Sequence, residues 1–567
     1  PGAGVRVDGV VEAPGGTVRI GDAATARATV TGTVSARGAG GTARGGLITV
    51  EAKDAVTLTS TAKLDASGAA GGGTVLVGTT GAGRQQRMAA RTAVEAGATV
   101  TADATASGDG GTVVVNSAES TTMLGALSAR GGAAGGNGGF IEISGMSALT
   151  INGQADTRAP AGRDGTVVID PVNIEVVGAL GAPVAPDANQ ATPLPTQITA
   201  ATNPADGATL FVLNSDINGF AGGTLRLDAT NNVTISAPIA MTGATAGLTI
   251  VAGQAVALNA AISVPGAAAT PGAITITANS ITSSAAGTIS AATAGGIVSL
   301  RGNTINLGAA ITAGGTVELG PRTAGATFAL SLSAANALVA PAITVGRTGL
   351  GDRSGWTPST GGALGEVTAT SAITLPAITT PANGTLSVFG GSIALDGAVI
   401  ASGGTVNLTA SSGDITQTAA ASLTADTLTA NASASGANVA LGTADTANQV
   451  STLGASGAGG AFTLITGAAL NVANAVTAGG TLSLQTPGLT TTAAGVLTGA
   501  NVVLRADAMD IGGRVAAPNG EINLRVNSAG QVIVLGRNSA GGDPSGIYLS
   551  GDELALLGDN GAGSPAA

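Results

Sequence analysis

Residues 385–408 read TLSVFGGSIALDGAVIASGGTVNL, and this stretch decides the fold. It begins and ends with the same apolar–polar–apolar unit, at 386–388 (LSV) and 406–408 (VNL), and the two copies start 20 positions apart. Between them lie a second unit, 393–395 (IAL), and a single aliphatic residue, Val399. Alternation of this kind places the apolar side chains of each unit on one face of a short β-strand.

The same period recurs far along the chain. Residues 502–524 contain the units VVL and MDI, then Val515, then INL, with the same intervals. Gly404 and Gly520 stand just before opening strands, where glycine allows the chain to turn a corner. Three strands and three corners in about 20 residues correspond to one coil of a parallel β-helix. We therefore predict an all-β, right-handed parallel β-helix (solenoid) of about 20–25 coils, since parallel crossovers are almost always right-handed.

Changes in coil length and proline content divide the chain into segments. We expect a β-helix with longer coils over 1–177, with an excursion near 81–93, followed by an irregular junction rich in proline over 178–220. A β-helix with coils of about 20 residues should follow over 221–557, with a loop at 346–362, and a Gly/Ser/Pro tail over 558–567.

Composition argues against several classes of function. Histidine and cysteine are absent, so Ser-His-Asp triads, cysteine nucleophiles, disulfides and His or Cys zinc sites are excluded. The net charge is -11, and no basic stripe with interleaved aromatic residues suggests nucleic-acid binding. The sequence contains no run of about 20 apolar residues, so no membrane-spanning helix is predicted. Residues 229–300 and 446–504 contain no ionisable side chain at all. We expect no enzyme activity, no catalytic residue, no metal site and no cofactor.

A few side chains stand out as weak surface candidates. Trp356 is the only tryptophan and lies beside Arg353 in a Gly-rich loop, where it can anchor a ligand or pin the loop to the solenoid. Arg84, Arg87 and Arg91 fall in the predicted excursion, either as a small basic face or as ordinary solvated residues. In both cases the structural interpretation is the stronger one.

Two pairs of carboxylates are the candidates for an acid–base apparatus. These are Asp507 with Asp510 and Asp552 with Glu553. Asp510 lies between the inward-facing Met509 and Ile511, so alternation directs it to solvent. We interpret both pairs as solvated surface residues.

One region is more specific than a repeat. Residues 125–145 read GALSARGGAAGGNGGFIEISG, and residues 165–176 read GTVVIDPVNIEV. These phrases resemble the filamentous haemagglutinin family, the large exoproteins of two-partner secretion. The C-terminal run 546–557, GIYLSGDELALL, is also similar to a recurring phrase of that family. Asn116 stands where the family pattern suggests tryptophan. The close resemblance covers about 45–250, and the looser one covers nearly the whole chain.

This resemblance implies a shaft region that is secreted to the extracellular space or cell surface of a Gram-negative bacterium. It implies an outer-membrane transporter as the partner during export. The family's N-terminal secretion domain is not found in this sequence, so we expect a shaft without its export end, whose two ends are open β-edges. Further expected partners are other copies of the chain, end to end or laterally, and a carbohydrate or protein receptor on host cells or matrix.

Three functions remain open at this point. The first is the structural shaft of an adhesin or extracellular filament. The second is the stalk of a contact-dependent toxin delivery protein, which the sequence beyond residue 567 would reveal. The third is a polysaccharide-binding or polysaccharide-cleaving β-helix, which a cleavage assay would reveal.

Overall fold

The computed structural model describes residues 4–83, 85–179, 196–203, 207–242, 247–267, 270–323, 326–333, 338–348, 367–442, 448–518, 520–536 and 546–558. It is a parallel β-solenoid of about 19 turns in these described residues, with only 2% helix. The predicted fold class is thus confirmed. The contacts divide the chain into two compact units, the first ending at Ser299 and the second beginning at Leu300.

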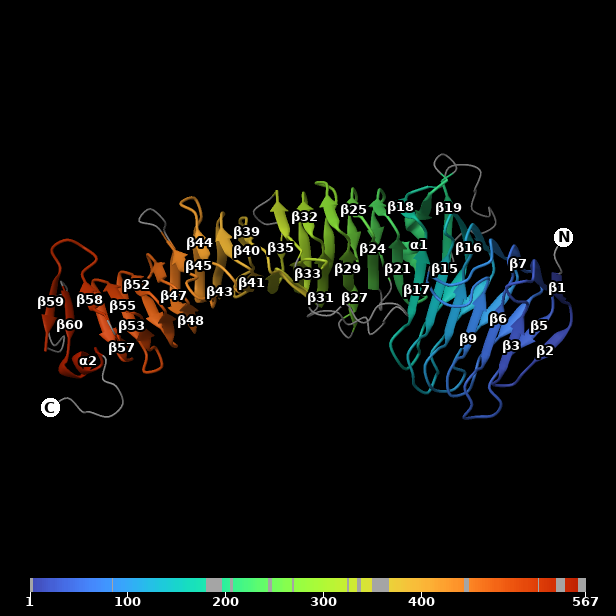
Figure 1. Cartoon of the computed structure of the whole chain (residues 1–567), viewed down its shortest axis with the longest axis horizontal. Helices are drawn as coiled ribbons and strands as arrows, with labels where there is room; N and C mark the ends of the chain where they lie inside the picture. Colours follow the sequence, from blue (N-terminus) through green and yellow to red (C-terminus); the bar gives the residue numbers. More distant parts are fainter. Residues whose placement is uncertain are drawn as a thin grey trace. The chain divides into compact units, whose positions relative to one another are not determined.

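In the first unit, successive coils place their strands side by side in parallel stacks (Figure 1). One face stacks β1 (Gly4–Val7), β4 (Arg27–Val30), β7 (Ala55–Leu58), β10 (Arg91–Val94), β13 (Ser120–Met123) and β16 (Ala148–Asp156). The next stacks β2 (Val10–Glu12), β5 (Thr33–Ser35), β8 (Lys63–Asp65), β11 (Thr99–Thr101), β14 (Ala126–Ser128) and the end of β16. The third stacks β3 (Thr17–Ile20), β6 (Leu47–Val50), β9 (Thr74–Val77), β12 (Thr112–Val115), β15 (Phe140–Ser144), β17 (Thr166–Asp170), β21 (Thr224–Ala229), β24 (Gly247–Ala252) and β29 (Ala273–Thr277).

Coil length is uneven in this unit. The third face pairs Thr17 with Leu47, Leu47 with Thr74, and Thr74 with Thr112. These intervals are 30, 27 and 38 residues, whereas Leu386 to Val406 in the second unit takes 20. The long coils help to explain why the turns number slightly fewer than the 20 to 25 expected.

A two-stranded insert interrupts the solenoid pattern within 178–220, the range predicted to be an irregular junction. Strand β19 (Gln197–Thr202) runs antiparallel to both β16 and β20 (Thr209–Leu213). Strand β20 in turn pairs in parallel with β18 (Asn173–Val177). On the third face, β15, β17 and β21 pair directly with no insert. Strands β19 and β20 therefore lie as two additional strands between β16 and β18, and the third face has no counterpart to them among the described residues.

Beyond the insert the regular stacking resumes. Strand β18 also pairs with β22 (Asn232–Ile235), which is followed by β25 (Ala255–Leu258) and β30 (Ser280–Ser283). The short helix α1 (Asn214–Gly219) follows β20 directly and buries Ile217, with Phe220 buried at its C-cap. Phe220 is among the largest fully buried side chains in a core of Val, Ile, Leu and Ala.

The second unit repeats the three-faced stack with shorter coils. One face contains β39 (Ile373–Leu375), β42 (Ile393–Leu395), β44 (Ile415–Gln417), β46 (Val439–Leu441), β49 (Phe462–Ile465), β52 (Thr481–Gln485), β55 (Asn501–Arg505) and β58 (Ile522–Arg525). Another contains β36 (Ala342–Val345), β41 (Thr385–Gly390), β43 (Val399–Ala410), β45 (Leu423–Ala432), β47 (Gln449–Leu453), β50 (Leu470–Val472), β53 (Gly488–Thr491) and β56 (Ala508–Ile511). The third contains β48 (Ser456–Ala458), β51 (Val476–Ala478), β54 (Leu497–Thr498) and β57 (Val515–Ala516).

The predicted register is confirmed in this unit. Leu386 pairs with Val406, and Val502 pairs with Ile522. Leu386, Val406 and Val502 are fully buried, whereas Ile522 in β58 is half-buried. Each aliphatic side chain removed from water contributes about 1.5–3 kcal/mol, and stacking extends this burial along continuous columns.

The outward residues differ from expectation in one respect. Alternation directs Ser387 and Asn407 outward, toward solvent, but both are half-buried. Asn407 Nδ2 donates to Ser387 Oγ at 3.3 Å, and Thr429 Oγ1 donates to Asn407 Oδ1 at 2.8 Å. Coil-to-coil stacking places these polar side chains against one another, so they shield each other from water while remaining hydrogen-bonded.

Near the C-terminal end of the second unit, a short helix packs against the last coils. Helix α2 (Gly551–Ala555) begins with a capping box, in which Ser550 and Glu553 each bond the other's backbone N–H. Glu553 also accepts from Ile511 N at 3.0 Å, and Val515 N donates to Leu556 O at 2.9 Å. Strand β60 (Gly546–Leu549) pairs with β59 (Val532–Leu535), whose Val532 and Leu535 are exposed.

Candidate functional site

The predicted excursion near 81–93 covers part of the outer surface of the third face. Thr79 and Met88 form an antiparallel bridge, and Thr80 N donates to Arg87 O at 3.1 Å. The described residues of this segment, 79–83 and 85–88, are called the strap here, and none of them is helical. The strap thus leaves β9 and returns to β10 as a narrow hairpin-like loop.

The arginine candidates of this region contact two separate carboxylates. Arg87 Nη2 pairs with Glu51 Oε2, directly after β6. Arg91, the first residue of β10, pairs with Glu119 at 3.4 Å, and both of these side chains are exposed. Arg84 lies outside the described residues. Arg87 therefore fastens the strap to the solenoid, and Arg91 forms a separate surface ion pair.

The strap covers a carboxylate, Glu142, that points outward from β15. Its exposed fraction is only 4%. The backbone N–H of Gly83 donates to both oxygens of Glu142 at 3.1 Å, and Ser144 Oγ donates to Oε1 at 2.9 Å. Burial, together with the nearby charge of Asp170, raises the pKa of Glu142 to about 7. This group titrates near neutrality and is covered by a surface loop.

The sequence pattern does not single out Glu51 or Glu142. Both lie where strand alternation points outward, which normally means exposure to solvent. Both are nevertheless buried, because the strap lies over them. The signal available in the sequence was an unusually long coil interval of 38 residues, from Thr74 to Thr112, which marks the insertion without showing where it folds.

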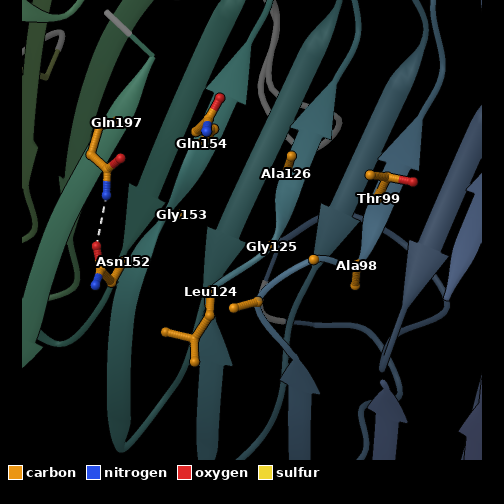
Figure 2. A pocket seen from close by; sticks show the side chains of 11 residues that line it. Ala98, Thr99, Leu124, Gly125, Ala126, Asn152, Gly153, Gln154 and Gln197 are labelled. Atoms are coloured by element: carbon orange, nitrogen blue, oxygen red, sulfur yellow. Dashed lines mark hydrogen bonds between the residues drawn. The ribbon is translucent and has the colours of Figure 1, made fainter. Parts of the chain in front are cut away.

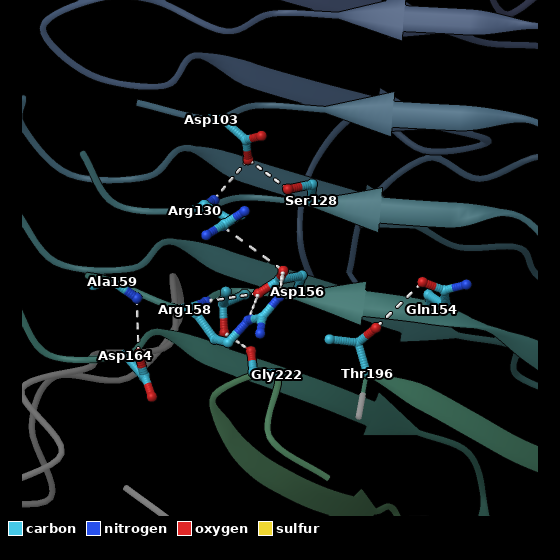
Figure 3. A network of polar contacts seen from close by, with 11 residues as sticks. Asp103, Ser128, Arg130, Gln154, Asp156, Arg158, Ala159, Asp164, Thr196 and Gly222 are labelled. Atoms are coloured by element: carbon cyan, nitrogen blue, oxygen red, sulfur yellow. Dashed lines mark hydrogen bonds and ion pairs between the residues drawn. The ribbon is translucent and has the colours of Figure 1, made fainter. Parts of the chain in front are cut away.

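A second polar network connects the ends of successive coils on the second face (Figure 3). Asp103 accepts from Ser128 Oγ at 2.6 Å and from Arg130 N at 2.7 Å, and its burial raises the pKa of its carboxyl. Asp156 pairs with Arg158 at 2.6 Å and with Arg130 at 3.7 Å. Opposite charges from neighbouring coils thus neutralise one another, which is a structural role for these residues.

A shallow groove of about 360 Å³ follows one corner of the first unit (Figure 2). Its lining includes Gly97, Gly125 and Gly153 from three successive coils. At one end, Gln197 Nε2 of the inserted strand β19 donates to Asn152 Oδ1 at 2.6 Å. None of the lining residues is charged. The groove offers neutral hydrogen-bonding groups and no acid–base pair.

The interpretation of both carboxylate pairs as solvated holds for one member of each pair: Asp510 and Asp552 are exposed, whereas Asp507 and Glu553 are half-buried and hydrogen-bonded. Asp510 is exposed, between the buried Met509 and Ile511, at a groove of about 250 Å³. Asp507 accepts from Ser528 N at 2.7 Å and from Ser528 Oγ at 2.7 Å, so it orders a turn. In the second pair, Asp552 is exposed while Glu553 caps α2.

Several remaining features bear on function. Trp356 and Arg353, together with most of the predicted loop at 346–362, lie outside the described residues, as does the tail from 559. Among the described residues, no group of three or more Asp or Glu side chains has the arrangement to hold a metal ion. None of the described helices is long and apolar enough to cross a lipid bilayer.

Comparison with known proteins adds no family to this description. A scan of the chain against protein-family models finds no match, and neither does a search of curated proteins.

Proposed function

We propose that this chain is the structural shaft of a secreted cell-surface adhesin or extracellular filament of a Gram-negative bacterium. The observation that carries the proposal is the continuity of the buried columns. Residues such as Leu386 and Val406 pair coil on coil with both side chains fully buried. A lone coil cannot bury enough apolar surface to offset the loss of conformational entropy on folding. Such coils are therefore stable only when many of them stack in a long array.

The outer surface supports the same proposal. Some ionisable side chains in the described residues pair across neighbouring coils, as Arg37 does with Asp65 and Arg91 does with Glu119. Outward polar residues form ladders between coils, as in Ser387, Asn407 and Thr429. Groups used in this way brace the stack. The chain is proposed to have no enzyme activity, no cofactor and no metal requirement.

The proposed partners follow from this role and from the resemblance of the sequence to two-partner secretion exoproteins. They are an outer-membrane transporter during export, other copies of the chain, and a carbohydrate or protein receptor. Self-association has some support in exposed aliphatic residues, since Val10 in β2 and Leu535 in β59 are both exposed.

Labelling of whole cells tests the proposed location. Antibodies raised against this chain are applied to intact and to permeabilised cells that produce it, with an antibody against a cytoplasmic protein as the matched control. We expect equal labelling of intact and permeabilised cells with the first antibody, and labelling only after permeabilisation with the second. Labelling by both antibodies only after permeabilisation would contradict the proposal.

A second experiment separates the shaft from the other two functions. The purified chain is incubated with a panel of acidic and neutral polysaccharides, and newly formed chain ends are measured. We expect none, and their formation would favour the polysaccharide-cleaving function. Killing of neighbouring cells on contact, lost when the gene is deleted, would favour the toxin stalk.

A further inference from the structure

Residues 546–558, which comprise β60 and α2, lie against two strands of the preceding coil and are called the edge cover here (Figure 1). Strand β60 packs beside β56, and its Ile547 and Leu549 are fully buried. Leu557 forms a parallel bridge with Val515 of β57. The opposite edges of β56 and β57 pair with β53 and β54. The edge cover therefore occupies the side on which the next coil of a solenoid would stack.

Hydrogen bonds fasten the edge cover to both strands. The backbone N–H of Ile511, the last residue of β56, donates to Glu553 Oε1 at 3.0 Å. The N–H of Val515 donates to Leu556 O at 2.9 Å, and the N–H of Gly558 donates to Val515 O at 3.0 Å. The edge cover thus supplies acceptors to both strands and a donor to β57.

The preceding coil shows what these bonds replace. Leu497 pairs with Val515, and its N–H donates to Arg514 O of the next coil at 2.8 Å. Val515 occupies the same position one coil later and makes the corresponding bond with Leu556. Unpaired N–H and C=O groups along a strand edge form a template on which another chain can pair. Because the edge cover bonds these groups itself, it withholds them from such pairing.

Glu553 is held in position by the start of α2. Ser550 N donates to Glu553 Oε2 at 2.7 Å, and Glu553 N donates to Ser550 Oγ at 3.2 Å. One carboxylate oxygen therefore closes the capping box, while the other accepts from β56. The neighbouring Asp552 is exposed. Glu553 is thus the side chain that joins α2 to the edge of β56.

We propose that the edge cover keeps copies of this chain apart, and that a second copy pairs with the edges of β56 and β57 once the edge cover is released. This rests on the proposed self-association of the shaft. The edge of β57 already accepts Leu557 in the parallel manner of a stacked coil. Strand β58 of the same coil pairs only with β55 among the described residues. Release therefore allows three strands of one coil to pair together, and coil-on-coil contact is what stabilises a solenoid.

Two substitutions in the full chain release the edge cover. Glu553→Ala removes the acceptor for Ile511 N, and Gly558→Pro removes the N–H that donates to Val515 O. Gly558 also has a φ of 135°, which proline cannot adopt. The matched control is Asp552→Ala, which removes the exposed carboxylate next to Glu553 on the same helix. Hydrogen exchange of the Ile511 and Val515 amides reports release, and light scattering reports the molar mass.

The expected results differ between the variants. The wild type and Asp552→Ala should exchange both amides slowly and should have the same molar mass at every concentration. In the dilute double variant, exchange of the Ile511 and Val515 amides should be about ten-fold faster or more, because the bonds that protect them are lost or weakened. As its concentration rises, the molar mass should reach that of a dimer or more, and both amides should regain protection as a second copy bonds them.

Three results would overturn the proposal. The first is fast exchange in a double variant that keeps the wild-type molar mass at every concentration. The second is association without renewed protection of the two amides, which would place the contact elsewhere. The third is slow exchange in the double variant, which would mean that these bonds do not fasten the edge cover.

Amides of β52 and β55 report whether the coil itself has unfolded, and they should remain protected throughout. If they do not, Glu553→Ala alone is the second variant: it should release Ile511 and associate more than Asp552→Ala does, and equal molar masses would contradict the proposal. None of these results changes the proposed surface location, which antibody labelling tests separately.

Discussion

Leu386 in β41 and Val406 in β43 lie directly beside each other in paired parallel strands, 20 positions apart in the sequence, and both side chains are completely buried. This relationship defines the architecture, because it equates one sequence period with one coil. The adjacent pair, Ser387 and Asn407, faces outward and is hydrogen-bonded across the same two strands. Inward and outward columns thus alternate residue by residue.

Substitutions at 406 and 407 should have very different consequences. Val406→Asp places a charge in a buried aliphatic column with no partner, and we expect it to cost more than about 4 kcal/mol or to prevent folding. Asn407→Asp is the matched control. It retains an oxygen that can accept from Thr429 and from Ser387, so its cost should stay below about 1 kcal/mol. Thermal unfolding followed by circular dichroism gives the comparison, and similar losses for both variants would contradict the assigned faces.

A glycine of the GGNGGF motif should be intolerant of a methyl group. A Cβ at Gly139 would overlap the carbonyl oxygen of Gly111 and the backbone of Gly110 in the preceding coil. We expect Gly139→Ala to destabilise the first unit by about 1–3 kcal/mol through this overpacking. At Gly41 a Cβ would meet no atom within 4 Å, so Gly41→Ala should be neutral or slightly stabilising. A lower melting temperature for Gly41→Ala than for Gly139→Ala would refute this explanation of the motif.

A buried amide in the second unit should contribute strongly to stability. Asn448 Oδ1 accepts from Gln417 Nε2 at 2.8 Å and from Leu423 N at 2.9 Å, and its Nδ2 donates to Ile465 O at 3.1 Å. Asn448→Leu leaves these groups without a hydrogen-bond partner. Each group that water cannot reach should lower the free energy of unfolding by about 1–3 kcal/mol. Asn501→Leu, at an exposed residue of β55, is the control and should cost under about 1 kcal/mol. Equal denaturation midpoints for the two variants would contradict this expectation, because water would then hydrogen-bond to these groups in place of Asn448 with no loss of stability.

The sequence was most informative wherever the period is local. Alternation predicts that the side chains of Leu386 and Val406 face the core, and their 20-residue interval predicts that they pair, without any knowledge of distant segments. Burial of Asn116 and Glu142 was not predictable in this way. Their alternation points outward, and only the path of the strap, which comes from an earlier coil, removes them from water.

The direction of an inserted strand was equally inaccessible. Residues 197–202 read QITAAT, and alternation does not distinguish a parallel strand from an antiparallel one. In the structure β19 runs against β16, with Gln197 opposite Gln154. The direction of a strand depends on the end of the neighbouring strand at which the chain arrives. The path of the preceding residues decides this, and local alternation does not encode it.

The most direct test of the central claim, that one period is one coil, is disulfide trapping across two coils. The chain has no cysteine, so Ser387→Cys with Asn407→Cys introduces a single defined pair. Their Cα atoms should lie about 4.8 Å apart, the spacing of paired strands and within the range that a disulfide spans. Ser387→Cys with Leu408→Cys is the slipped control, with side chains on opposite faces. We predict that mild oxidation closes the first pair nearly completely and the second hardly at all; efficient closure of the slipped pair, with the first pair remaining reduced, would contradict the account.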